Sequence, residues 1–436
     1  MTPKELLKNL GYDDDVIVKI LEWYNNSLPE TLNYYIEKTF NYFIKKGYTK
    51  DEIIKMTKTL PTIFGYSEES LNKKYQYFVK KGYTLEEIVK MTKTLPTIFG
   101  YSEENLNNKY QYFIEKGYTL EEIKKMTKTL PTLFGHSEEN LNNKYQYFLE
   151  KGYTLEEIVK MTKTFPTLFS LSEETLNNKY QYFMEKGYTL EEVVKMTKKL
   201  PTIFGYSEEL LNKKYQYFME KGYTLEEVVK MTKTVPSLFG YSEESLSKKY
   251  QYFIDKGYTL EEIIKMTKTL PALFNYSEES LNKKYQYFID KGYTLEEIIK
   301  MTKKLPTIFS HSEENLDNKY QYFMEKCYTM EEIIKMTKTL PTLLGLSEEN
   351  IEEKLNFYND INLSLITIND TKKLMQSVEL SYARYMYFKE HGITIDESNY
   401  IRLFYDNKKF SKQYGITKEK LLERYKYDDE KRKKVK

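Results

Sequence analysis

The chain has 436 residues, with 67 lysines and arginines against 65 aspartates and glutamates, so its formal net charge is only +2. Such a balance gives no global electrostatic attraction to a polyanion, although charge can still be segregated by face. The sequence contains no apolar run of about 18 residues, which excludes a membrane-spanning helix, and its single cysteine, Cys327, excludes an internal disulfide framework.

The same features bear on location. A single cysteine fits a reducing compartment, and the N-terminal segment MTPKELLKNLGYDDD has neither an arginine nor the apolar stretch of a signal peptide. We therefore expect an intracellular protein of the cytoplasm or nucleoid. Location in an organelle stays open as an alternative, although no transit peptide is visible.

Residues 1–60 predict an N-terminal cap made of degenerate repeats. Residues 16–21 fit a worn second helix of a repeat, and residues 31–46 fit a worn first helix. From Gly47 the sequence is nearly regular.

Residues 61–375 predict a regular array, because one proline returns every 35 residues. A fixed period of this length is the signature of a solenoid built from small helical units. The fold class expected is therefore an all-α solenoid of about nine helix-helix-turn repeats with helical caps. The repeating prolines are Pro61, Pro96, Pro131, Pro166, Pro201, Pro236, Pro271, Pro306 and Pro341.

Within each repeat, numbered 1 to 35 from its proline, the capping signals predict two helices. Helix A begins after a serine at position 7, such as Ser67, which is a favoured N-cap residue, and it ends at a glycine such as Gly82. Helix B begins with the capping box Thr84-Leu-Glu-Glu87 and ends before the next proline, Pro96. A short turn, with 3₁₀ geometry expected, links the repeats.

Residues 376–425 leave the period and predict a C-terminal helical cap, with helices near 381–390, 400–405 and 417–425. Residues 426–436 form a charged tail for which we expect disorder. Cys327 stands where the preceding copies have glycine, so we expect strain of about 1 kcal/mol at that helix end.

The copies differ chiefly at positions 5, 6, 10, 13, 19 and 20. Positions 6, 10 and 13 share one stripe of helix A with a tyrosine at position 17, and a lysine at position 14 flanks this stripe. We expect this stripe to be exposed, because it lies well round the helix from the apolar residues. Ser and Lys occur together at positions 10 and 13 three times, and Asn with Asn three times. Small polar side chains and lysines contact base edges and phosphates, and aromatic rings stack on bases.

The pattern therefore predicts a nucleic-acid reader with two or three side chains per repeat. The candidate residues are Ser70, Lys73, Lys74, Tyr77, Asn105, Asn108, Lys109, Tyr112, Asn140, Asn143, Lys144, Tyr147, Thr175, Asn178, Lys179, Tyr182, Leu210, Lys213, Lys214, Tyr217, Ser245, Lys248, Lys249, Tyr252, Ser280, Lys283, Lys284, Tyr287, Asn315, Asn318, Lys319 and Tyr322.

A structural interpretation of the same residues stays open. A solvated helix face also accumulates substitutions, and the tyrosines could pack on the next repeat. Lys90 and Lys93 in helix B suit the negative end of the helix dipole at least as well as a phosphate.

The order of these signals resembles the repeat of the mitochondrial transcription termination factor (mTERF) family. It is carried by the serine-led helix from Ser102, by Gly117-Tyr-Thr-Leu-Glu-Glu-Ile123 and by Leu130-Pro131. The segment from Ser381 to Phe388 is similar to the family's closing segment and adds Arg384 as a candidate contact. The resemblance implies a left-handed helical solenoid that binds nucleic acid, chiefly duplex DNA, in organellar gene expression.

Sequence and resemblance together predict a sequence-selective nucleic-acid-binding protein that acts in transcription termination or gene regulation, with duplex DNA favoured over RNA. A single-stranded RNA reader of about one base per repeat and a protein-binding scaffold are the alternatives. We expect a monomer, with a protein partner left open.

Catalysis is not expected. The chain has only three histidines, and no metal spacing, phosphate-binding loop or nucleophile motif occurs. We therefore expect no enzyme, cofactor or metal.

Overall fold

Every repeat folds as the capping residues predict. The computed structural model describes residues 1–427, and in this part of the chain all regular elements are helical, without a β-strand. The predicted tail at 426–436 lies almost entirely outside the described residues.

Two compact units make up the chain. The first comprises residues 1–219 and 224–240, and the second comprises 220–223 and the chain from Tyr241 onward. The division falls inside the repeat array, and the predicted boundaries near residues 60, 375 and 425 stay predictions.

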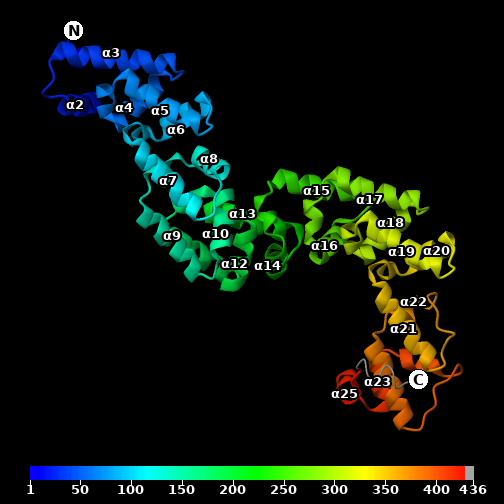
Figure 1. Ribbon diagram of the computed structural model, residues 1–436. Helices are drawn as coiled ribbons and strands as arrows, with labels where there is room; N and C mark the ends of the chain where they lie inside the picture. Colours follow the sequence, from blue (N-terminus) through cyan, green and yellow to red (C-terminus); the bar gives the residue numbers. More distant parts are fainter. Residues whose placement is uncertain (428–436) are drawn as a thin grey trace. The chain divides into compact units, whose positions relative to one another are not determined.

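Helices A and B alternate along each compact unit (Figure 1). Helix A of successive repeats is α3 (Pro29–Lys45), α5 (Glu68–Lys80), α7 (Glu103–Glu115), α9 (Glu138–Glu150), α11 (Glu173–Glu185), α13 (Glu208–Lys221), α15 (Glu243–Asp255), α17 (Glu278–Asp290), α19 (Glu313–Glu325) and α21 (Glu348–Asp360). Helix B is α2 (Asp14–Trp23), α4 (Lys50–Thr59), α6 (Leu85–Thr94), α8 (Leu120–Thr129), α10 (Leu155–Thr164), α12 (Leu190–Lys199), α14 (Leu225–Thr234), α16 (Leu260–Thr269), α18 (Leu295–Lys304) and α20 (Met330–Thr339).

The expected 3₁₀ turns are present at each repeat's proline. They are η1 (Pro61–Gly65), η2 (Pro96–Gly100), η3 (Pro131–Gly135), η4 (Pro166–Phe169), η5 (Pro201–Gly205), η6 (Pro236–Gly240), η7 (Pro271–Asn275), η8 (Pro306–Ser310) and η9 (Pro341–Gly345).

The caps hold more elements than the sequence predicts. An additional helix, α1 (Pro3–Asn9), begins at a capping box between Thr2 and Glu5. In the C-terminal cap, α22 (Thr371–Leu374) precedes α23 (Val378–Glu390), and residues 400–404 form a 3₁₀ turn, η10 (Tyr400–Phe404), rather than an α-helix. The helices α24 (Asn407–Tyr414) and α25 (Lys418–Arg424) follow.

Caps fix the helix ends as expected. The Ser67 hydroxyl accepts a hydrogen bond from the Ser70 amide at 3.1 Å. The Thr84 hydroxyl accepts one from the Glu87 amide at 3.2 Å, while the Thr84 amide donates to the Glu87 carboxylate at 2.9 Å. Each such cap contributes about 1 kcal/mol.

The core lies between the helices of neighbouring repeats. Leu71, Tyr75 and Phe78 of α5 are buried, as are Ile88 and Met91 of α6. Because neither helix can cover its apolar face alone, each repeat depends on the next for its stability.

Buried hydroxyl groups link successive repeats in a way that the apolar pattern does not show. The Tyr83 hydroxyl lies 2.6 Å from the Thr127 hydroxyl and accepts a hydrogen bond from Tyr110 at 2.9 Å. Since Tyr110 and Thr127 both belong to the next repeat, this network fixes one repeat against its neighbour.

Candidate nucleic-acid interface

The tyrosines at position 17 are not exposed, so the expectation that they form a surface for stacking on bases is wrong. Tyr112 is only 7% exposed, and its hydroxyl donates to the Asn142 side-chain oxygen of the next repeat at 2.9 Å. Burial raises the pKa of Tyr112, as expected for a phenol withdrawn from water. The same position holds Tyr77, Tyr147, Tyr182, Tyr217, Tyr252 and Tyr322, which are buried, and Tyr287, which is half-buried.

The lysines at position 14 likewise contact the next repeat instead of facing solvent. Lys109 is 8% exposed, and its ammonium donates to the His136 carbonyl oxygen of the next repeat at 2.5 Å. Burial lowers the pKa of Lys109. Lys74, Lys144, Lys179, Lys214 and Lys319 are also buried, and Lys249 and Lys284 are half-buried. The expectation that these lysines flank an exposed reading face is therefore wrong.

Arg384 is not a surface residue either, which corrects the candidate contact that the resemblance implied. It is 1% exposed, and its guanidinium donates to the Leu403 and Tyr405 carbonyl oxygens, both at 2.7 Å. It also donates to the Asn407 side chain at 2.9 Å. Arg384 thus organises the C-terminal cap.

Positions 10 and 13 do face solvent in nearly every repeat, but their surroundings are acidic. The Lys73 ammonium pairs with Glu69, one turn earlier, at 2.8 Å, and the same pair recurs as Lys213–Glu209, Lys248–Glu244 and Lys283–Glu279. In α7, where position 13 is Asn108, the exposed charged residues are Glu103, Glu104 and Glu115. A nucleic-acid role for positions 10 and 13 stays a prediction.

Variation at position 6 follows contacts between repeats. The Tyr241 hydroxyl donates to the Asn275 side chain at 3.1 Å, and the His136 ring lies 3.4 Å from the Ser170 hydroxyl. Each pair joins position 6 of one repeat to position 5 of the next. Burial, together with Lys109 and Lys144, lowers the pKa of His136. Part of the copy-to-copy variation is therefore internal packing.

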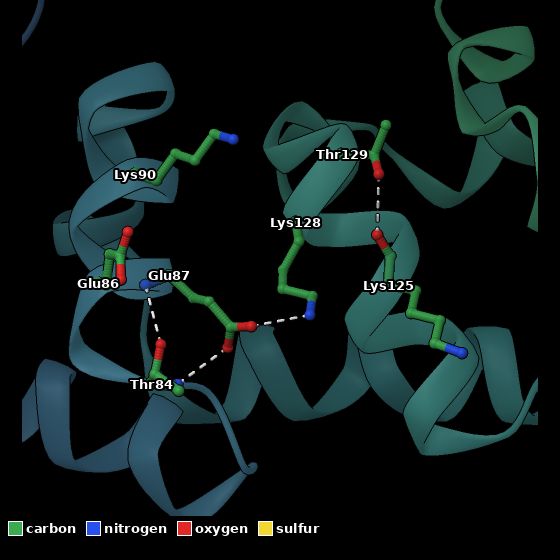
Figure 2. Close-up of a pocket in the computed structure, with 7 residues that line it drawn as sticks. All are labelled: Thr84, Glu86, Glu87, Lys90, Lys125, Lys128 and Thr129. Atoms are coloured by element: carbon green, nitrogen blue, oxygen red, sulfur yellow. Dashed lines mark hydrogen bonds and ion pairs between the residues drawn. The ribbon is translucent and has the colours of Figure 1, made fainter.

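The hollows of the surface lie along helix B instead. A hollow of about 830 Å³ separates α6 from α8 and is lined by Thr84, Glu86, Glu87, Lys90, Lys125, Lys128 and Thr129. Figure 2 shows the Lys90 side chain extending from α6 over this hollow toward α8. Similar hollows occur beside α10 and, in the second compact unit, beside α16.

Lysines at position 33 form ion pairs with the preceding repeat beside these hollows. The Lys128 ammonium pairs with Glu87 of the preceding repeat at 2.8 Å (Figure 2). This hydrogen bond, with one from the Thr84 backbone, lowers the pKa of Glu87. The same ladder contains Lys93–Glu52, Lys163–Glu122, Lys198–Glu157 and Lys233–Glu192 in the first compact unit and Lys303–Glu262 and Lys338–Glu297 in the second.

Lysines at position 30, which we call the position-30 row, lie on the surface of helix B. All are exposed: Lys90, Lys125, Lys160, Lys195 and Lys230 in the first compact unit, and Lys265, Lys300 and Lys335 in the second. Lys195 and Lys300 pair with the glutamate four residues earlier, at 2.6 and 2.7 Å. The other six form no ion pair with the described residues. The sequence alone does not distinguish Lys90 from Lys93, because only the fold shows that Glu52 pairs with Lys93.

Apolar residues help to line some of these hollows. Leu155 and Val159 line the hollow beside α10 together with Gly117, Lys160 and Lys163. The leucine at position 25 is unusually exposed for its type, reaching 54% at Leu120.

Two further findings concern the described residues alone. They contain no cluster of three or more His, Cys, Asp or Glu side chains arranged to hold a metal ion. None of their helices combines the length and apolar character that a membrane crossing requires.

Comparison with known proteins identifies the repeat. The mTERF family matches in four overlapping segments, residues 1–124, 82–196, 187–301 and 257–370. Among curated proteins no sequence matches the chain significantly. The matched segments extend over residues 1–370, and at the level of the family they support a nucleic-acid-binding repeat protein in transcription regulation. The chain therefore belongs to the mTERF family.

Proposed function

We propose that this protein binds duplex DNA along the helix B face and acts in transcription regulation, termination included. The observation that carries the proposal is the position-30 row. Its lysines recur once per repeat on the surface of helix B, several of them beside open hollows, and six of them form no ion pair with a carboxylate of the described residues. Exposed lysines at regular intervals are suited to the regularly spaced phosphates of a duplex.

Burial of the tyrosines favours a duplex over single-stranded RNA. Readers of single strands stack bases on exposed aromatic rings. The rings at positions 15 and 17, such as Tyr110 and Tyr112, are buried, and helices B from α4 to α20 contain no aromatic residue. A duplex needs no such platform, because its phosphates are its outermost groups.

A protein-binding scaffold is the second candidate, and the exposed leucines at position 25 are the observation that favours it. A hollow that is lined by Leu155, Val159 and several lysines also suits an apolar, acidic peptide. Family membership and the exposed lysines favour DNA. A reducing compartment, a monomeric state and a non-enzymatic role are parts of the same proposal.

A triple variant tests the helix B face. Changing Lys90, Lys125 and Lys160 to glutamine removes three exposed charges without touching the ladder of ion pairs. Binding to a short labelled duplex is measured by fluorescence anisotropy between about 50 and 200 mM salt. The slope of log affinity against log salt should fall in magnitude by about 2.7, or about 0.9 for each lost phosphate contact.

A matched control removes the same charge from helix A, by changing Lys73, Lys80 and Lys213 to glutamine. All three are exposed, so thermal unfolding should show both triple variants folded. The control should keep the salt slope of the natural chain. Equal losses in both variants would contradict binding at helix B, and a natural chain that binds no duplex at low salt would contradict the proposed function.

A further inference from the structure

The residues that line the helix B hollows hardly change between repeats. Helices α6, α10 and α14 read LEEIVKMTKT, LEEIVKMTKT and LEEVVKMTKT. In the second compact unit α16 and α18 read LEEIIKMTKT and LEEIIKMTKK. A surface that reads different bases at successive repeats needs different side chains there, so this near-identity argues against base reading.

The chemistry of these side chains points the same way. Asparagine, glutamine and arginine make bidentate contacts that distinguish one base pair from another, and helices B from α4 to α20 contain none of these three residues. Lysine can also contact guanine, but the same lysine recurs at position 30 of each repeat from Lys90 to Lys335, so it cannot distinguish successive bases. The outward groups of these helices are lysine, glutamate, threonine and leucine. Lysine binds a phosphate as a point charge and needs no particular base beside it.

Three of the residues that line the hollow beside α10, Gly117, Leu155 and Val159, have no side-chain group that donates or accepts a hydrogen bond. Glutamates stand at the start of helix B, and one of them, Glu122, is held by Lys163 at 2.9 Å. Glu156 also lines this hollow, but three lysines, Lys116, Lys160 and Lys163, line it as well, so the lining keeps a positive net charge.

Helix A does not supply the missing selectivity through the contacts observed. Position 17 is buried, position 6 contacts the next repeat, and lysine at position 13 pairs with the glutamate at position 9. These contacts assign part of the differences between copies to internal packing and surface ion pairs.

Resting on the proposed function, we infer that the repeats recognise the sugar-phosphate backbone of duplex DNA and are indifferent to its base sequence. Each repeat then contributes a similar increment of electrostatic affinity, and the protein occupies a length of duplex rather than a defined site. Its ligand class is duplex DNA of any sequence.

The test compares many sequences at one salt concentration, using the full chain. Selection from a randomised duplex pool should enrich no motif, and duplexes rich in A·T or in G·C should bind within about fivefold of one another, less than good bidentate base contacts discriminate. The Lys90, Lys125 and Lys160 triple variant should weaken binding to every duplex by the same factor. This uniform loss is the signature of phosphate contacts.

Three outcomes are decisive. Uniform affinity with uniform loss in the triple variant supports the inference. An enriched motif bound about 1,000-fold more tightly than the pool would overturn it while leaving duplex binding intact. Failure to bind any duplex would overturn the proposed function, and the inference with it.

Discussion

The Tyr83 hydroxyl lies 2.6 Å from the Thr127 hydroxyl, although the two residues belong to successive repeats and are 44 positions apart. Tyr110 donates to the same tyrosine oxygen at 2.9 Å. All three side chains are buried, so this network connects repeats where water cannot compensate for a lost bond.

Replacing Tyr83 with phenylalanine should destabilise the chain by about 1–3 kcal/mol, because the buried hydroxyls of Tyr110 and Thr127 lose a partner. Urea unfolding followed by circular dichroism measures the loss. The control is Tyr101→Phe, at a tyrosine that is only half-buried. An equal effect at both positions would show that the network has no special weight.

Stability should fall as the pH rises above 10. Burial raises the pKa of Tyr118 from its ordinary value of 10.0 to about 12, and Tyr153 behaves alike. The unfolded chain therefore loses these protons first. The stability due to the neutral phenols is complete below pH 10 and is lost progressively as the pH rises from 10 through 12.

Absorbance of the ionised phenol near 295 nm, recorded beside urea unfolding at each pH, checks this. Tyr118→Phe should show a weaker fall of stability across the same pH window. Ionisation of all the tyrosines at pH 10 in a chain that remains folded would contradict the prediction.

Lys109→Met should lower stability by about 1–3 kcal/mol and leave DNA binding unchanged. The substitution removes the donor to the His136 carbonyl oxygen at a site where the lysine is buried. Lys125→Met, on the exposed helix B face, should weaken DNA binding and leave the stability unchanged. Anisotropy and thermal unfolding on both variants separate the two roles, and a binding loss at Lys109 without a stability loss would restore that lysine as a phosphate contact.

Cys327→Gly should stabilise the second compact unit by about 1 kcal/mol. Cys327 has a φ of +65°, a conformation that costs a side chain about 1–2 kcal/mol and glycine almost nothing. The reciprocal change, Gly292→Ala, should destabilise, since φ there is +100° and the added methyl carbon would lie 3.3 Å from Ile334. Differential scanning calorimetry should show melting shifts of opposite sign.

The double variant Ser245→Asn, Lys248→Asn gives one repeat the asparagine pair that three other repeats have at positions 10 and 13. It breaks the exposed 2.6 Å pair between Lys248 and Glu244, which should cost less than about 1 kcal/mol. Preference among duplexes should not change. If selection with this variant yields an altered motif over one local stretch, helix A reads bases after all.

The sequence by itself determined the helices and their order. Ser67, the Thr84–Glu87 capping box and Pro96 act on backbone groups a few residues away, so their effects are local and could be predicted with the repeat period. The position of glycine predicted the positive φ that Cys327 has to adopt. The family, too, could be recognised from the spacing of these local signals.

Only the tertiary structure decided which polar residues face outward. Helical periodicity places Lys109 and Tyr112 on the side away from the apolar stripe, but the next repeat covers that side and supplies the His136 carbonyl and the Asn142 side chain as partners. In helix B, Lys125 and Lys128 look alike in sequence. They differ in the structure, because Lys128 pairs with Glu87, which lies 41 residues earlier in the chain. A contact between repeats depends on how they stack, which no pattern within one repeat reveals.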